Sequence, residues 1–194
     1  MKTEARMLAR FTRFLAHETA GVSAVEFALI TPIFLLILVG TGDIGGSLKA
    51  KFELSSAVAA GSNYALLNGT SVSSSGGASL ARNITAVAAS GFTSANGTIQ
   101  VVVNNGTAIA YDASTSAATQ SGTASNADLC YCPTSSAGAL TWGSSATCGS
   151  VCAGGGTAGK FVTISVSKPY SPLFGGMGIV KSGNITVQSV VQPQ

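Results

Sequence analysis

Four cysteines lie close together in the sequence: Cys130, Cys132, Cys148 and Cys152. Four thiolates could hold a zinc ion, but the C-x-C spacing of the first pair is tighter than the C-x₂₋₄-C spacing usual in zinc sites. A redox-active C-x-x-C motif is absent from the sequence. In an oxidising compartment such a cluster forms structural disulfides, so the compartment of the protein decides between the two kinds of site.

The other side chains offer little for catalysis. His17 is the sole histidine, so a chain that loses its first residues also loses the usual general base. The sequence has no G-x-S-x-G nucleophile motif, and its later carboxylates are scattered: Glu26, Asp43, Glu53, Asp112 and Asp128. We therefore expect no catalytic residue, no cofactor and no bound metal.

Residues 40–45 (GTGDIG) fit the G-x-G-x-x-G pattern of dinucleotide sites. Such a site needs a short buried strand before it and an acidic residue about 20 positions later. Here the preceding apolar run is too long for a strand and contains Pro32, and no acidic residue occurs between Glu53 and Asp112. We interpret the pattern as small residues at a membrane exit.

The composition argues against an ordinary cytosolic enzyme. Only 9% of the 194 residues are charged, whereas about 25% is usual in soluble domains. The net charge of +3 is too small for a nucleic-acid footprint, so no nucleic acid is expected as a partner.

Residues 22–42 predict a transmembrane helix. Their only charge is Glu26, and as a helix they would extend about 31 Å, close to the roughly 30 Å of a bilayer core. Pro32 would kink the helix, which a membrane helix tolerates. Four basic residues precede the span, so the positive-inside rule places the N-terminus in the cytoplasm. The alternative is a cleaved secretory signal with its apolar core at 27–39.

The stretch Gly21-Val22-Ser23-Ala24-Val25-Glu26-Phe27 resembles the processing site of prepilins of the tight-adherence (Flp) pilus system. The wider sequence AGVSAVEFALITPIFLLILVGTGDIG resembles the start of TadE-like proteins, the minor pseudopilins of that system. The resemblance implies that a prepilin peptidase cuts between Gly21 and Val22, with Glu26 fifth and Phe27 sixth in the mature chain. The string CYCP…C…C…KFVTISVSKPYSPLF is similar to the C-terminal part of some TadE-like proteins.

Glu26 has a physical role in such a protein. Cleavage would create an amine on Val22, which can pair with a Glu26 carboxylate of a neighbouring helix in low dielectric. Removing one partner of a buried pair typically costs about 3–5 kcal/mol, so the pair would set the axial register between subunits. The alternative is a solvated carboxylate at the headgroup level.

The sequence predicts an α+β fold, with a small antiparallel-sheet head after the long transmembrane helix. We divide it into a cytoplasmic leader (1–21), a transmembrane helix (22–42), a helical extension (43–67), a linker (68–77) and the head (78–194). Ile44, Leu48 and Phe52 begin an apolar stripe on the extension. Within the head we expect a helix at 78–89, strands at 99–103, 107–111, 161–167 and 184–191, an exposed loop at 113–127 and another loop at 170–176.

The predicted extracytoplasmic compartment favours disulfides in the loop 130–152. A bridge between Cys130 and Cys132 is awkward, which leaves two pairings across the loop. These are 130–148 with 132–152, or 130–152 with 132–148, and the spacing does not choose between them.

We therefore expect a TadE-like minor pseudopilin of a bacterial inner membrane, with its head in the periplasm, that helps to assemble an adhesive pilus. The resemblance implies these partners: prepilin peptidase, other pilins and pseudopilins, the inner-membrane assembly platform and membrane lipid. Two alternatives are an unprocessed single-pass envelope protein and a secreted disulfide-bonded binding domain.

Overall fold

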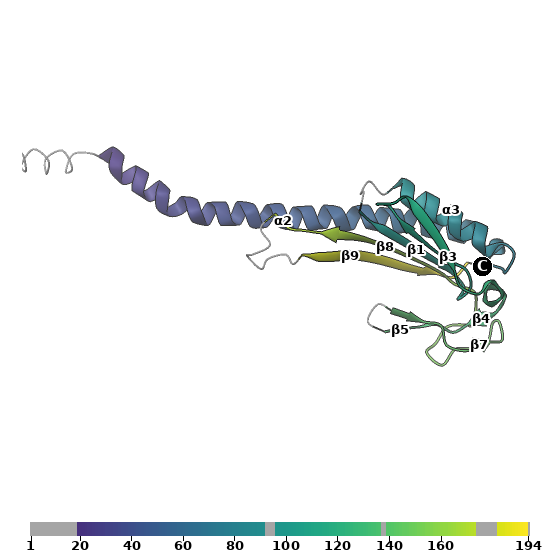
Figure 1. Cartoon of the computed structure of the whole chain (residues 1–194). Helices are drawn as coiled ribbons and strands as arrows, with labels where there is room; N and C mark the ends of the chain where they lie inside the picture. The colour runs from purple at the N-terminus through teal and green to yellow at the C-terminus, as the bar shows by residue number, and fades with distance from the viewer. Residues whose placement is uncertain (1–18, 92–95, 137–138, 174–181, 194) are drawn as a thin grey trace, which may run out of the picture.

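The computed structural model describes residues 19–91, 96–136, 139–173 and 182–193. A single helix, α2 (Thr19–Leu67), runs through 49 residues. Its N-terminal part projects beyond the rest of the molecule, and its C-terminal part lies along the head (Figure 1). The predicted transmembrane helix and helical extension are therefore one continuous element. The predicted leader lies outside the described residues as far as residue 18.

The head combines helices with antiparallel strands, as the sequence predicts. Its main sheet has five strands in the order β3-β2-β1-β8-β9, and two short pairs, β4 with β7 and β5 with β6, lie apart from it. The elements after α2 are η1 (Gly69–Ser71), α3 (Gly77–Ser90), β1 (Thr98–Val103), β2 (Ala108–Asp112), β3 (Ala117–Ser121), η2 (Ala124–Asp128), β4 (Cys130–Tyr131), β5 (Thr134–Ser136), β6 (Ala139–Thr141), β7 (Ser145–Ala146), β8 (Val162–Tyr170) and β9 (Gly183–Val191).

Helices α2 and α3 cover one face of the sheet and form the core with it. Alternate residues of β1, namely Ile99, Val101 and Val103, are fully buried, which is the period of a strand with one covered face. The helices meet them with residues that include Leu54, Ala57 and Ile84. A side chain at Gly61 would crowd Ile84 and Ile164, whose nearest atoms would lie 3.2 and 3.3 Å from its Cβ.

The apolar stripe predicted on the extension does not enter this core. Ile44, Leu48 and Phe52 are 44%, 47% and 70% exposed. The buried residues of α2 lie on another side of the helix: Gly40 and Asp43 come first, and the buried apolar residues begin at Ala50 and Leu54. The sequence pattern identified the helix correctly but not its buried face, because two apolar faces run along this segment.

Part of the predicted loop at 113–127 is strand β3, so that prediction was wrong. Every residue of β3 is exposed, and therefore no alternation of apolar and polar residues marks it in the sequence. Backbone pairing with β2 defines it, from Ala108 opposite Ser121 to Asp112 opposite Ala117. The predicted loop at 170–176 also begins too early, since Tyr170 is the last residue of β8. Residues 174–176 lie outside the described residues.

Candidate functional site

The first candidate site is the N-terminal part of α2, where the sequence predicts cleavage and assembly. All residues from 21 to 30 are exposed. Val22 is 59% exposed and Phe27 is 73% exposed, and Glu26 lies between them with an exposed side chain. The structure thus places Gly21, Val22, Glu26 and Phe27 on one projecting helical segment that no other part of the described chain contacts.

Gly21 serves no packing role in the described part of the chain. A Cβ built on it would meet no atom within 4 Å, and the same holds for Gly42 and Gly45. Glycine in a helix interior costs about 1 kcal/mol relative to alanine, so folding alone does not explain its presence at position 21. Val22 and Glu26 are four residues apart and therefore occupy the same face of α2, one turn from each other.

Pro32 lies inside α2. It has no N–H to donate to the carbonyl of Ala28, and the neighbouring Thr31 hydroxyl donates to the carbonyl of Phe27 over 2.6 Å. Figure 1 shows the N-terminal part of α2 bent away from the axis of the remainder. Proline is a common cause of such a bend, and it gives the projecting segment a direction different from the helix over the head.

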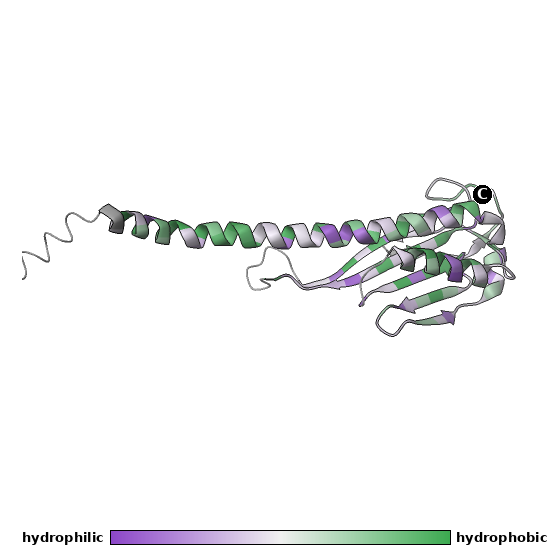
Figure 2. Cartoon of the chain, turned by 90° about the horizontal axis from the view of Figure 1, so that it is seen from above, coloured by the Kyte–Doolittle hydropathy of each residue, from purple (hydrophilic) through white to green (hydrophobic). Residues whose placement is uncertain are grey.

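The apolar character of the projecting segment is continuous. Figure 2 shows hydrophobic residues along most of the helix beyond the head. Of the described part of the chain, α2 is the one helix long and apolar enough to cross a membrane. Leu29, Ile33, Leu36 and Ile37 are all about half exposed or more, at 70%, 62%, 47% and 60%. Side chains of this kind need lipid or other apolar surfaces around them.

Both disulfides belong to the segment between β3 and β8. Cys130 is bonded to Cys148 and Cys132 to Cys152, which is one of the two pairings that the sequence left open. The described residues include all four cysteines, and none is free. These sulfurs therefore hold the segment to itself and are not available as zinc ligands. No group of three or more metal-ligating residues occurs among the described residues.

Asn104 connects this cross-linked segment to the sheet, a role that the sequence analysis missed. Its side-chain nitrogen donates to the carbonyls of Ala127 and Leu129, over 3.0 and 2.6 Å. Its side-chain oxygen accepts from the backbone N–H of Phe161 over 3.1 Å. Asn104 and Asn105 have φ of 50° and 54°, so the predicted Asn-Asn-Gly hairpin turn uses the two asparagines as its left-handed residues.

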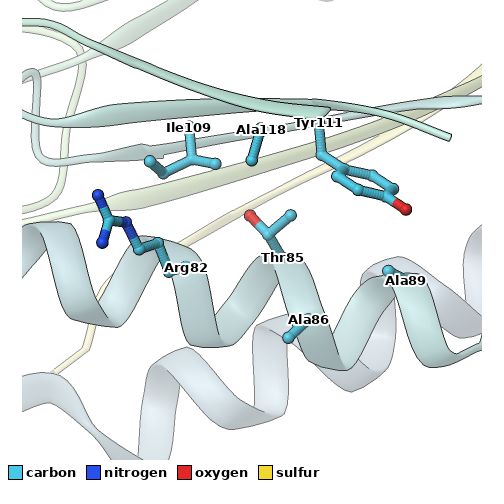
Figure 3. Close-up of a pocket in the computed structure, with 7 residues that line it drawn as sticks. All are labelled: Arg82, Thr85, Ala86, Ala89, Ile109, Tyr111 and Ala118. Carbon is cyan, nitrogen blue, oxygen red and sulfur yellow. The ribbon is translucent and has the colours of Figure 1, made fainter. Parts of the chain in front are cut away.

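A hollow of about 320 Å³ lies between α3 and the β2–β3 edge of the sheet (Figure 3). Arg82 lies at one end and Tyr111 at the other, with Thr85 pointing toward the strands between them. The Arg82 guanidinium already donates to the side chain of Gln120 over 2.9 Å. With mainly alanine and isoleucine along its walls, this hollow has the character of an apolar contact surface.

Two carboxyl groups of the head have lowered pKa values. Hydrogen bonds from the hydroxyl and backbone N–H of Ser114 lower the pKa of Asp112. Hydrogen bonds from Ser74 do the same to the pKa of Asp128, with a smaller contribution from the charge of Lys160. Asp128 thereby ties η2 to the turn before α3. Both groups stabilise local structure, and neither lies beside the projecting helix.

These features define a class of protein: one apolar helix, suited to a single membrane crossing, continues into a small α+β head that contains a disulfide-linked segment. Residues 21–62 match the family model of TadE-like protein, so the chain is similar to that family over this stretch. The matched residues all lie within α2. TadE-like proteins are associated with the cell envelope and belong to a pilus system. No curated protein and no solved structure matches the chain.

Proposed function

We propose that this protein is a minor pseudopilin that takes part in the assembly of a tight-adherence pilus. It acts through helix packing in the inner membrane and performs no catalysis. Prepilin peptidase removes residues 1–21, and the head lies in the periplasm. The observation that carries this proposal is the division of α2: one continuous helix has a largely exposed apolar half and a half fixed in the head.

The fixed half makes the helix and the head one mechanical unit. Leu54, Ala57 and Ala65 of α2 have no exposed surface. Glu53 of α2 also forms an ion pair with Lys168 of β8, with 3.3 Å between Oε2 and Nζ. A displacement of the membrane helix is therefore transmitted to the head, as a subunit that moves as a block during assembly requires.

The free half offers neighbours one charged group on an apolar surface. Glu26 is the only charged residue between Gly21 and Gly42, and it is exposed on the helix. A carboxylate in that position is costly in lipid unless it meets a cation. After cleavage, the amine of Val22 on an adjacent subunit would supply that cation. The exposed Phe27 beside it would enlarge the apolar contact.

The partners of this proposal are prepilin peptidase, other pilins and pseudopilins, the assembly platform and membrane lipid. The N-terminus of the uncleaved chain is cytoplasmic, as the basic residues Lys2, Arg6, Arg10 and Arg13 favour. Incorporation into the pilus follows from the same helix packing.

N-terminal sequencing of the protein from membranes tests the proposal. We expect a start at Val22 in cells with the peptidase and at Met1 in cells without it. The variant Gly21→Ala should block cleavage, whereas Gly42→Ala, an equally open glycine of the same helix, should not. A start at Met1 in both strains would support the unprocessed envelope protein instead, and a start near residue 43 would support the secreted domain.

The role of Glu26 is tested separately with Glu26→Gln, which removes the charge and keeps the size of the side chain. We expect processed, stable protein and a loss of pilus assembly of about ten-fold or more, since breaking a buried pair costs about 3–5 kcal/mol. Normal assembly by this variant would remove the pairing role but not the cleavage.

A further inference from the structure

We propose that the end of β8 with the residues after it as far as Leu173, called the hairpin end below, rests on the lipid surface, so that the protein meets the membrane at a second place besides its helix. The contact consists of Tyr170, Leu173, Ile44 and Leu48, and its partner is the headgroup layer of a bilayer. The proposal rests on the proposed function in one respect, namely that α2 crosses the membrane over residues 22–42.

Hydrogen bonds fix the height of the hairpin end relative to the helix. The backbone N–H of Leu173 donates to the carboxylate of Asp43 over 2.8 Å. The hydroxyl of Tyr170 donates to the backbone carbonyl of the same residue, also over 2.8 Å. Asp43 is the first residue after the proposed span, so the end of β8 lies at the level where the helix leaves the bilayer. In Figure 1 this end of the head is the part nearest to the projecting helix.

A glycine allows this close approach. A Cβ on Gly46 would lie 2.8 Å from the hydroxyl oxygen of Tyr170, which is inside van der Waals contact. Gly46 lies one turn beyond Gly42 on α2, and the open space at Gly42 contrasts with the filled space at Gly46. The hairpin is therefore seated against α2 at this height by both hydrogen bonds and shape.

The surface at this height is apolar. Leu173 is 81% exposed, and Ile44 and Leu48 are 44% and 47% exposed, on a side of α2 that the head does not cover. With a rise of about 1.5 Å per residue, Ile44 and Leu48 lie about 3 and 9 Å beyond residue 42. The headgroup region extends about 5–8 Å beyond the bilayer core on each side. Ile44 falls inside that region, and Leu48 lies just beyond it with a side chain that tilts back toward the helix N-terminus and thus toward the membrane.

The charges nearby suit an anionic lipid surface. Lys49 and Lys51 are exposed on the next turn of α2, and their long side chains can reach back to phosphate groups. The two nearest carboxylates are turned to the protein. Asp43 is buried, with 4% exposed, and Glu53 is paired with Lys168. The side facing the membrane thus presents cations and apolar groups, with a tyrosine at the level where aromatic residues favour the interface.

Tryptophan fluorescence in the full chain tests this contact. The native Trp142 is replaced by phenylalanine, which keeps a ring against Tyr131, and single tryptophans are introduced as Leu173→Trp, Val151→Trp or Leu36→Trp. Each variant is reconstituted into phosphatidylethanolamine–phosphatidylglycerol vesicles with lipids brominated near the headgroup or deep in the acyl chains. Val151 is the matched control, because it is 83% exposed and belongs to the disulfide-linked segment.

We expect the shallow bromines to quench Leu173→Trp about two-fold and to leave Val151→Trp unchanged, while the deep bromines quench Leu36→Trp. Quenching at position 36 without quenching at 173 overturns the lipid contact and leaves the span intact. Absence of quenching at position 36 overturns the span itself, and with it the proposed function. Equal quenching at 173 and 151 also overturns the contact, because it indicates non-specific adsorption of the head.

A second comparison tests the seating of the hairpin. In the Leu173→Trp background, Gly46→Leu should displace Tyr170 and reduce the quenching at 173, whereas Gly45→Leu, at an open position, should not. Unchanged quenching with Gly46→Leu would show that the seating on α2 does not hold Leu173 at the membrane, and would overturn the proposed geometry.

Discussion

The backbone N–H of Leu173 donates to the carboxylate of Asp43, across 130 positions of sequence. The bond joins the end of β8 to the helix at the residue that follows the apolar segment. It places a buried carboxylate at a point where the described part of the head reaches the level of the proposed membrane exit. This bond adds to the core packing of α2 and to the Glu53–Lys168 ion pair and holds the end of β8 against the helix.

Replacing Asp43 with alanine should release the end of β8. A hydrogen bond to a charged group contributes about 1.5–3 kcal/mol, so the amide of Leu173 should exchange its hydrogen about ten-fold faster or more. Asp43→Asn keeps an acceptor oxygen and should retain most of the protection. Hydrogen–deuterium exchange with mass spectrometry measures both, and equal exchange in the wild type and Asp43→Ala would contradict the role of this bond.

Asn104 predicts a large effect at a single turn residue. It is fully buried, and Asn104→Ala would remove three hydrogen bonds and leave the N–H of Phe161 without its side-chain acceptor. We expect a loss of about 3 kcal/mol or more in the free energy of unfolding, measured by denaturant titration of the full chain in detergent.

Asn105→Ala is the matched control for that experiment. Asn105 has the same left-handed backbone, with φ of 54°, so its replacement measures the cost of the backbone conformation, which is about 1–2 kcal/mol. If the two variants lost equal stability, the side-chain bonds of Asn104 would contribute nothing beyond the turn itself.

The disulfides should stabilise the head unequally. Their sequence separations are 18 and 20 residues, for which chain entropy predicts about 3 kcal/mol each. Cys130 is only 4% exposed, so replacing Cys130 and Cys148 by serine also buries a hydroxyl, and this pair should lower the melting temperature more than the pair Cys132 and Cys152. Peptide mapping without reduction provides the check on connectivity, and a 130–152 cross-link would contradict the structure.

The parts of the fold that the sequence predicted are those with a repeating local pattern. The long apolar run predicted α2, the Asn-Asn-Gly turn predicted the β1–β2 hairpin, and alternation predicted β8. Strand β3 has no buried residue and no pattern to reveal it. The disulfide pairing depends on how β4 and β7 approach each other. Their pairing, with Cys130 opposite Ala146, is a long-range contact that no local pattern reveals.

The candidate sites divide in the same way. Gly21 and Glu26 were selected by the resemblance to a prepilin processing site; the structure places them on an exposed helix, and their roles stay a prediction. The roles of Asp43 and Asn104 could not be predicted, because their partners lie far away in the sequence, at Leu173 and Phe161. Asn104 connects the disulfide-linked segment to the sheet because its side chain is buried between them. Burial depends on the assembled fold and is not visible in a turn sequence.

Acid should weaken the head through Asp112 and Asp128. The pKa of each is lowered in the folded protein by hydrogen bonds, mainly from Ser114 and Ser74. Their contribution to stability is therefore present above the ordinary carboxyl pKa of about 3.9, and it is lost as the pH falls through the lowered value. We expect the melting temperature of the full chain in detergent to decrease when the pH is lowered below about 4.

The double variant Asp112→Asn and Asp128→Asn should show a flatter pH profile of the melting temperature there. Ser150→Ala, at an exposed site of the disulfide-linked segment, should follow the wild type. A profile for the double variant as steep as that of the wild type would mean that other groups cause the acid sensitivity.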